Sequence, residues 1–361
     1  MAETAADSTT EAPDAPTPWL RTIATAVGLT TLIALIVVAF SWPALTAEPQ
    51  GVGLAVAGPE AAVAQVEPLL TEQAGDVYDL TVVDDREAAV AAVESRDVAG
   101  ALVLGPEPEL LTASANGTVN QVIAQLADPL QAALTSQAQA GEPGETPPAA
   151  TLTVTDVVPY TAEDPNGALL SSAFFPILFG GMIGGIAISV AISGSLRRIV
   201  AVVAYSAVGG LVLTSILQGW FGSIQGDFWT NLAAFTLAIG AIAAPVVGVV
   251  ALVGRAGIAV GPVVMMLFAN PISGAALPPQ FLPGAWGAVG QWFPPGASAT
   301  LVRELSYFPG ADTTFPWLVL ATWFAGGLLL ALVGHSRDAR TARREQAVDL
   351  QPARGRAPIP A

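Results

Sequence analysis

Arg303 and Glu304 are the only adjacent opposite charges in a proline-rich segment, 270–310. Such a pair could hold the headgroup of a substrate or gate an outer vestibule. It could also be an exposed or structural ion pair, which contributes little stability by itself. The same segment supplies the other residues that we expect along a substrate path: Asn270, Pro271, Ser273, Gly274, Pro294, Pro295 and Gly296.

The chain of 361 residues carries few of the side chains that perform catalysis. It has no cysteine, no lysine and one histidine, His335, so all 13 basic residues are arginine. This composition excludes disulfides, thiolate metal sites, Schiff-base chemistry and the P-loop lysine, and it leaves little room for a histidine-based triad. We therefore expect no enzyme, no metal site and no cofactor.

Proline and tryptophan shape the segment that contains Arg303. Its seven prolines prevent a continuous helix, and Trp286 and Trp292 suit the outer membrane interface. Non-helical backbone at membrane depth is tolerated only where protein shields it or where it lines a wet cavity. We expect a break after Asn270, a re-entrant excursion over 271–312, and a short helix near Ala297–Leu305.

Six stretches are candidates to cross a bilayer. A crossing needs about 20 mostly apolar residues, and five stretches reach that length without a charged residue. The sixth has 15 residues and contains Pro262, so it can cross only if it continues past Pro271 or is tilted or broken. The stretches are Thr22–Trp42, Leu169–Ser193, Ile199–Gly219, Leu232–Val253, Ala256–Asn270 and Phe315–Gly334.

The arginines orient these stretches. Arginines precede the first stretch, lie between the second and third and between the fourth and fifth, and follow the last. Six crossings place all of these on one side, which the positive-inside rule assigns to the cytoplasm. The bias toward Ala, Arg, Gly and Pro suggests a GC-rich bacterial genome. We therefore expect a multi-pass protein of the bacterial inner (plasma) membrane with both termini in the cytoplasm.

Residues 44–167 have the composition of a soluble acidic domain. They hold 19 acidic residues against two arginines, so nucleic acid is an unsuitable partner. Strands and helices alternate, which predicts an α/β domain with parallel pairings. Asp84 and Asp85 precede a helix at Arg86–Ser95, where a carboxylate can cap it. The expected strands are Gly51–Gly58, Val77–Val83, Val98–Leu104 and Thr151–Val158, and the other helices are Glu60–Gln73 and Val119–Ala138.

The predicted fold is an α-helical membrane protein of six transmembrane helices, with an extracytoplasmic α/β domain inserted between the first two. The parts are a disordered cytoplasmic tail (1–18), the first transmembrane helix (19–43), the α/β domain (44–167), a five-helix membrane domain (168–335) and a basic cytoplasmic tail (336–361).

Four glycines on the second stretch form two overlapping small-xxx-small pairs. Missing side chains let another helix approach closely. The contact could be a moving or dimerising one, or ordinary packing inside one bundle. The residues are Gly180, Gly181, Gly184 and Gly185.

The layout and the proline motifs resemble a known group, the type-2 ABC export permease superfamily, and within it the YhgE/Pip (phage infection protein) family. The shared layout is one N-terminal span, a large extracytoplasmic domain and five further spans. The matching motifs are Asn270-Pro271-Ile272-Ser273-Gly274, Leu277-Pro278-Pro279, Phe281-Leu282-Pro283, Phe293-Pro294-Pro295-Gly296, and Arg303 near Tyr307-Phe308.

The resemblance implies a permease-like subunit of an envelope exporter that moves a hydrophobic or amphiphilic substrate outward. It implies contact with membrane lipids, a homodimer, and a separate cytoplasmic ATPase subunit as the energy source. No span holds an ionisable residue, which argues against ion-coupled transport. The loop at Gly194–Arg198 is short for docking an ATPase and favours the YhgE/Pip-like branch. The alternative is a non-transporting envelope receptor or scaffold that acts through its extracytoplasmic domain.

Overall fold

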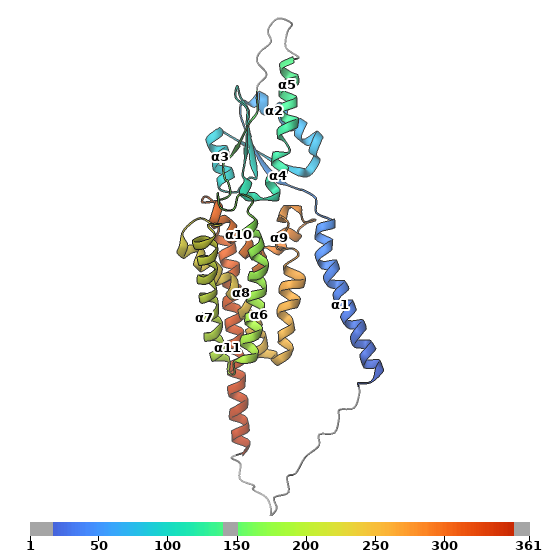
Figure 1. The fold of residues 1–361 in the computed structure, drawn as a ribbon, viewed down its shortest axis with the longest axis vertical. Helices are drawn as coiled ribbons and strands as arrows, with labels where there is room; N and C mark the ends of the chain where they lie inside the picture. Colours follow the sequence, from blue (N-terminus) through green and yellow to red (C-terminus); the bar gives the residue numbers. More distant parts are fainter. Residues whose placement is uncertain (1–16, 140–150, 350–361) are drawn as a thin grey trace, which may run out of the picture.

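The computed structural model describes residues 17–139 and 151–349 of the chain. A small α/β domain stands at one end of a bundle of long helices, and the two lie along one axis (Figure 1). The expected disordered tail, through residue 16, and the end of the expected basic tail, 350–361, lie outside the described residues.

Five helices are long and apolar enough to cross a membrane, at the places where five of the six stretches predict them. The protein is thus mostly helical, with the composition of a multi-pass membrane protein. A π-helix continues the third of them and a 3₁₀-helix continues the fourth, and the last helix extends beyond its apolar stretch. They are α1 (Trp19–Leu45), α6 (Ala168–Ala191), α7 (Ser195–Thr214) with η3 (Ser215–Trp220), α8 (Phe228–Val253) with η4 (Gly254–Ala259), and α11 (Thr314–Asp349).

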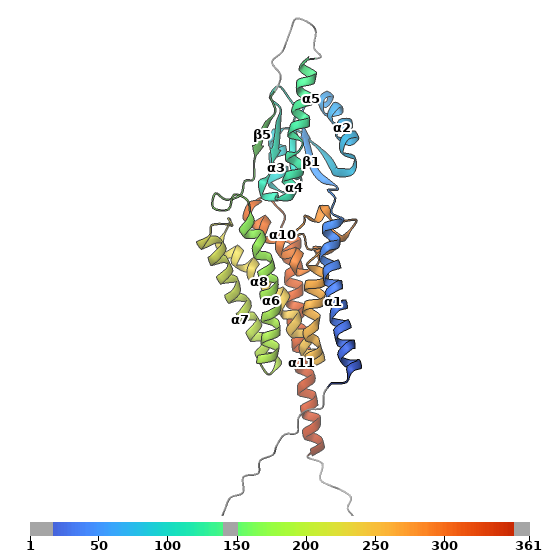
Figure 2. The ribbon, with the colours of Figure 1, turned by 45° about the vertical axis from the view of Figure 1, so that its right-hand side comes forward.

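The sixth stretch, Ala256–Asn270, is helical but irregular. It begins with the 3₁₀ turns of η4 and continues into the π-helix η5 (Pro262–Ala269), which ends at Asn270 as expected. Pro262 has no N–H to donate, so a regular ladder cannot run through this point. The segment lies alongside the bundle and leads from the end of α8 back toward the α/β domain (Figures 1 and 2).

Helix α8 is the centre of the bundle. Its small residues let its neighbours approach closely, because helices in a membrane associate by packing rather than by a hydrophobic drive. A side chain at Gly240 would meet the ring of Phe324 of α11, and one at Gly248 would meet the backbone of Gly327. Asp227 caps the start of α8 by accepting the Thr230 N–H at 2.8 Å.

The α/β domain contains a five-stranded sheet in the order β2-β1-β3-β4-β5. Strand β1 is an interior strand and almost wholly buried, as its apolar sequence predicts, and it pairs in parallel with β2 and β3. Asp85 caps α3 by accepting the Ala88 N–H at 2.8 Å, as expected. The elements are β1 (Val52–Ala57), α2 (Glu60–Ala74), η1 (Gly75–Val77), β2 (Tyr78–Val83), α3 (Arg86–Glu94), β3 (Gly100–Val103), β4 (Glu109–Thr112), η2 (Ser114–Asn116), α4 (Thr118–Ala124), α5 (Ala127–Gln139) and β5 (Thr153–Asp156).

Strand β4 corrects the prediction of parallel pairings throughout. It has only four residues, Glu109–Thr112, and it runs antiparallel to β3. Pro106 and Pro108 precede it, and the sequence pattern predicts only the end of a strand at Gly105-Pro106 rather than a hairpin. The helix expected over Val119–Ala138, with an interruption near Asp128-Pro129, is divided into α4 and α5 near Leu126.

The α/β domain rests on the segment between η5 and α11. This segment contains η6 (Pro279–Phe281), α9 (Trp286–Gly290) and α10 (Pro294–Tyr307). Phe281 belongs to the apolar core on one face of the sheet, and Phe308 joins the core on the other face to that of the bundle. Domain and bundle therefore share packed side chains rather than only a linker.

Candidate functional site

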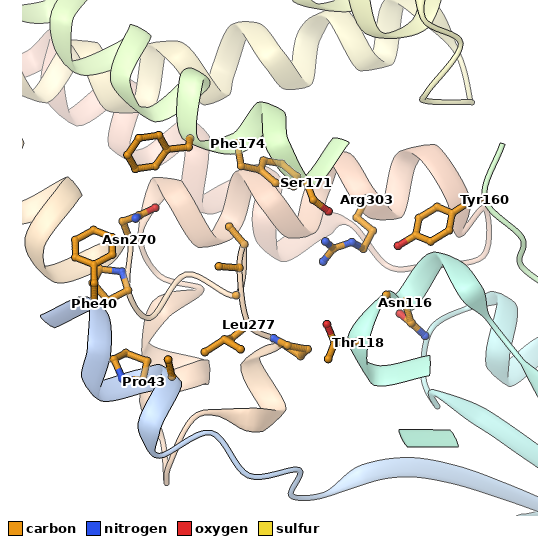
Figure 3. Close-up of a pocket in the computed structure, with 18 residues that line it drawn as sticks. Phe40, Pro43, Asn116, Thr118, Tyr160, Ser171, Phe174, Asn270, Leu277 and Arg303 are labelled. Atoms are coloured by element: carbon orange, nitrogen blue, oxygen red, sulfur yellow. The ribbon is translucent and has the colours of Figure 1, made fainter. Parts of the chain in front are cut away.

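A cavity of about 490 Å³ lies where the α/β domain meets the membrane helices. We call it the junction pocket. Its wall comes from four distant parts of the chain, namely the end of α1, the turn before α4, the start of α6, and the segment 270–278 with α10. Figure 3 shows these parts facing one another across the pocket. The pocket is our candidate site because it joins four of the residues expected along a substrate path: Asn270, Pro271, Gly274 and Arg303.

One end of the junction pocket is polar. The Arg303 guanidinium lies there with the Ser171 hydroxyl, the Tyr160 phenol and the turn that carries Asn116 and Thr118 (Figure 3). These groups are hydrogen-bond donors or acceptors of the kind that fix a ligand's orientation.

The other end is mostly apolar. Phe40 and Pro43 of α1 and Phe174 of α6 line it together with Leu277, and Asn270 is the polar side chain beside them (Figure 3). Pro43 is the buried residue of α1, whereas the rest of that helix is largely exposed and stands apart from the bundle (Figure 1). The apolar end of the pocket is therefore bounded by a helix with a large exposed apolar surface.

Tyr160 is held in place by contacts from the α/β domain and from α10. Its backbone N–H donates to Ser114 Oγ at 3.2 Å, and its ring meets the ring of Tyr307 edge-on at 5.4 Å between centroids. Gly167 has a φ of +62°, and a side chain there would overlap the Tyr160 ring. Asp164 accepts the backbone N–H groups of Ala168 and Leu169, each at 2.9 Å, and so caps α6 directly below this tyrosine.

Helix α10 positions Arg303. Pro294 and Pro295 stand at its first positions, where the missing N–H has no partner to lose and the fixed φ suits a helix. Most of α10 is buried, and Arg303 is only partly exposed. Burial, together with the positive charge of Arg96, lowers the pKa of Arg303 to about 10. Arg303 is therefore still a cation at neutral pH.

Glu304 has a different partner from its neighbour. Arg96 of the α/β domain forms an ion pair with it, with Nη1 at 3.0 Å from Oε1, and both side chains are over 80% enclosed, at 18% and 12% exposure. Arg96 Nε also donates to Asn116 Oδ1 at 3.1 Å, and the guanidinium lies 5.4 Å from the Phe308 ring centroid. Burial raises the pKa of Glu304, against the lowering effect of Arg96.

Glu304 also faces a second cavity, of about 360 Å³, which Asp79 and Asp97 help to line. Its Oε2 atom is buried and has no hydrogen-bond partner among the described residues. The described part of the chain contains no group of histidine, cysteine, aspartate and glutamate that could hold a metal ion.

The expected substrate-path residues separate into four groups. The first group lines the junction pocket, as described above. Ser273 is buried instead, and its hydroxyl donates to the Asn270 carbonyl at 2.8 Å. Glu304 links α10 to the α/β domain through its ion pair with Arg96. The remaining three residues form the buried start of α10: Pro294, Pro295 and Gly296.

The four glycines of α6 lie at contacts inside the chain. Side chains at Gly181 and Gly185 would meet α8, at Ile242 and at the Ala243 carbonyl. Gly180 and Gly184 face Tyr205 of α7, whose hydroxyl donates to the Gly180 carbonyl at 2.7 Å. These contacts match the packing interpretation of the motif, and its use in dimerisation stays a prediction.

The residues that the sequence reasoning missed come from outside the proline-rich segment. Asn116 and Thr118 form an Asn-Gly-Thr turn, Tyr160 follows the last strand, and Ser171 begins α6. The turn with its glycine was a visible signal. Nothing in the sequence indicates that it faces Arg303, almost two hundred residues later.

Comparison of the chain with protein-family models, with curated proteins and with solved structures gives no match. The resemblance to the YhgE/Pip family therefore stays a prediction from the motifs.

Proposed function

We propose that this protein is a permease-like subunit of a bacterial envelope exporter that moves a hydrophobic or amphiphilic substrate outward. The observation that carries the proposal is the junction pocket, which has a polar end and an apolar end and lies between membrane helices and a soluble domain. A molecule with a polar head and an apolar body fits such a pocket, because each part meets a surface of its own kind.

The proposal includes a topology. The segment 254–270 crosses the membrane as the fifth of six crossings, and both termini are cytoplasmic. The support is that the α/β domain contacts the segment beyond this crossing: Glu48 N–H donates to the Phe281 carbonyl at 3.1 Å, and Arg96 pairs with Glu304. Contacts of this kind require both parts to lie on the same side.

The proposal also includes partners. An ATPase subunit supplies the energy, because the apolar membrane stretches of the described helices contain no Asp, Glu, Lys, Arg or His to couple to an ion gradient. Two copies of the chain form the transport unit. Co-purification of an ATPase and the mass of the complex in lipid nanodiscs test these two points.

Two adjacent serines allow a matched test of the pocket. Ser171 and Ser172 are both exposed in the first turns of α6, but only Ser171 lines the junction pocket. We expect Ser171→Trp to fill the pocket and reduce export of amphiphiles at least tenfold, whereas Ser172→Trp retains export. The measurement compares cells that lack the gene with cells that carry each variant at equal membrane levels.

The rival function, a receptor or scaffold without transport, gives a different result. Export would then be the same in cells with and without the gene, and neither tryptophan would change it.

A further inference from the structure

Arg303 is the only charged residue among those that line the junction pocket. The surrounding α/β region is strongly acidic, with 19 carboxylates against two arginines over 44–167. The carboxylates near the pocket are already engaged: Glu304 pairs with Arg96, and Asp164 caps α6. The pocket therefore presents one uncompensated positive charge.

The guanidinium of Arg303 makes no hydrogen bond and no ion pair with any residue in the described ranges. A guanidinium offers five N–H donors in a planar fork, and leaving such a group partly enclosed and unpaired is costly. The Ser171 hydroxyl lies beside it, and the Tyr160 hydroxyl faces the same end of the pocket (Figure 3). Together they form a polar cluster around a cation that has no anionic partner among the described residues.

Tryptophans show that this cluster lies at the level of lipid headgroups. Trp42, Trp286 and Trp292 are 59%, 47% and 62% exposed, and they lie around the end of the membrane helices nearest the α/β domain. Trp220 and Trp229 are exposed at the same end. Amphipathic rings gather where the bilayer meets water, so the apolar end of the pocket faces acyl chains and the polar end faces headgroups.

We propose that the junction pocket binds an anionic lipid-like amphiphile, with its phosphate or carboxylate on Arg303 and its acyl part between Phe40 and Phe174. This inference rests on the proposed function, for which it names the substrate class. Phosphate and carboxylate share the chemistry that matters here, because both accept paired hydrogen bonds from the guanidinium fork.

The test uses the purified full-length chain in neutral detergent and lipids with identical acyl chains. The probes are a phosphate-monoester lipid, the free fatty acid, a phosphocholine lipid and diacylglycerol, with inorganic phosphate as the soluble anion. Native mass spectrometry counts bound lipid in pairwise competition. We expect the wild-type chain to prefer one of the two anionic lipids over diacylglycerol at least tenfold, and inorganic phosphate not to compete at equal concentration.

Two arginine variants separate the pocket from general surface charge. Arg303→Gln removes the pocket's charge and keeps much of its volume, and we expect the anionic preference to fall to within twofold of unity. Arg197→Gln removes an exposed arginine from the α6–α7 turn and should leave the preference unchanged.

The competition in the wild-type chain keeps the proposal testable if Arg303→Gln does not fold. Equal binding of anionic lipid and diacylglycerol overturns the proposal, as does a preference that Arg303→Gln retains. Effective competition by inorganic phosphate would show a free-anion site instead and would also overturn it. If the wild-type chain shows no anionic preference while Ser171→Trp still stops export, this inference is wrong and the exporter function remains in place. The reverse pattern, a clear preference without any export, would remove the function alone.

Discussion

Arg96 links the α/β domain to α10 through three contacts of one side chain. It pairs with Glu304, donates to Asn116 and lies over the Phe308 ring. It is also the one described residue other than glycine with a positive φ, +62°. A non-glycine residue in this region costs free energy, so the surrounding contacts must hold the backbone there.

Removal of the Arg96 side chain should therefore destabilise the whole chain. Arg96→Ala leaves Glu304 enclosed without a cation, and we expect the free energy of unfolding to fall by about 2 kcal/mol. Alanine has the same left-handed penalty as arginine, so the substitution isolates the side chain. Thermal unfolding of the purified full-length protein measures the loss.

A matched control for this variant is Arg86→Ala. Arg86 pairs with Glu109 at 2.5 Å, but its side chain is 51% exposed, so its loss should lower the unfolding free energy much less than the loss of Arg96. If the two variants lose equal amounts of unfolding free energy, the pair of Arg96 with Glu304 does not hold the α/β domain to α10.

At the scale of elements, three glycines let the turns of the proline-rich segment stack. Side chains at Gly287, Gly290 and Gly296 would collide with the backbone of Pro279, Ile272 and Gly290. In this segment backbone groups approach the Cα atoms of the three glycines so closely that a side chain there would not fit. Because Gly296 lies in the first turn of α10, this packing positions α10 and, with it, Arg303.

Gly290→Ala should break the stack, because the added methyl group overlaps the Ile272 carbonyl. We expect a loss of about 3 kcal/mol in unfolding free energy, together with a loss of lipid binding. Gly326→Ala in α11 is the control, since a side chain there meets nothing within 4 Å. If both variants unfold at the same temperature as the wild-type chain, the packing described for this segment is wrong.

The elements with a strong periodic or apolar pattern could be predicted from the sequence. Five helices long and apolar enough to cross a membrane, the buried strand β1 and the cap at Asp85 follow from local residue types. Strand β4 and the irregular segment 254–270 were harder, because four residues or a proline-broken helix leave little pattern to read. The pocket was only half predictable. Its residues in 270–303 share one visible motif, whereas Asn116, Tyr160 and Ser171 reach it through tertiary packing alone.

The pair Arg303 and Glu304 shows the same limit. Adjacent charges in a sequence suggest one ion pair, but neighbours on a helix point about 100° apart. In the structure Glu304 pairs with Arg96, 208 positions away, whereas Arg303 lines the junction pocket. Separation of the two charges is what gives the junction pocket its sign.

At the scale of the whole molecule, the account depends on sidedness. The α/β domain, the loop after η3 and the segment that carries Arg303 contact one another: Tyr307 donates to the Ser223 carbonyl, and Arg96 pairs with Glu304. The chain leaves this side through α8 and must return to it through 254–270. The central claim is thus that the junction pocket faces outward and both ends of the chain face the cytoplasm.

Labelling of single cysteines tests this claim most directly, because the natural chain has no cysteine. The four positions are all exposed: Asp84→Cys and Asp312→Cys near the pocket side, and Arg255→Cys and Ser336→Cys at the far ends of α8 and the apolar part of α11. We predict that a membrane-impermeant thiol reagent labels the first two in intact cells, and the last two only after permeabilisation. Labelling of Ser336→Cys in intact cells with protection of Asp312→Cys would contradict the account, because the segment 254–270 would then not cross the membrane.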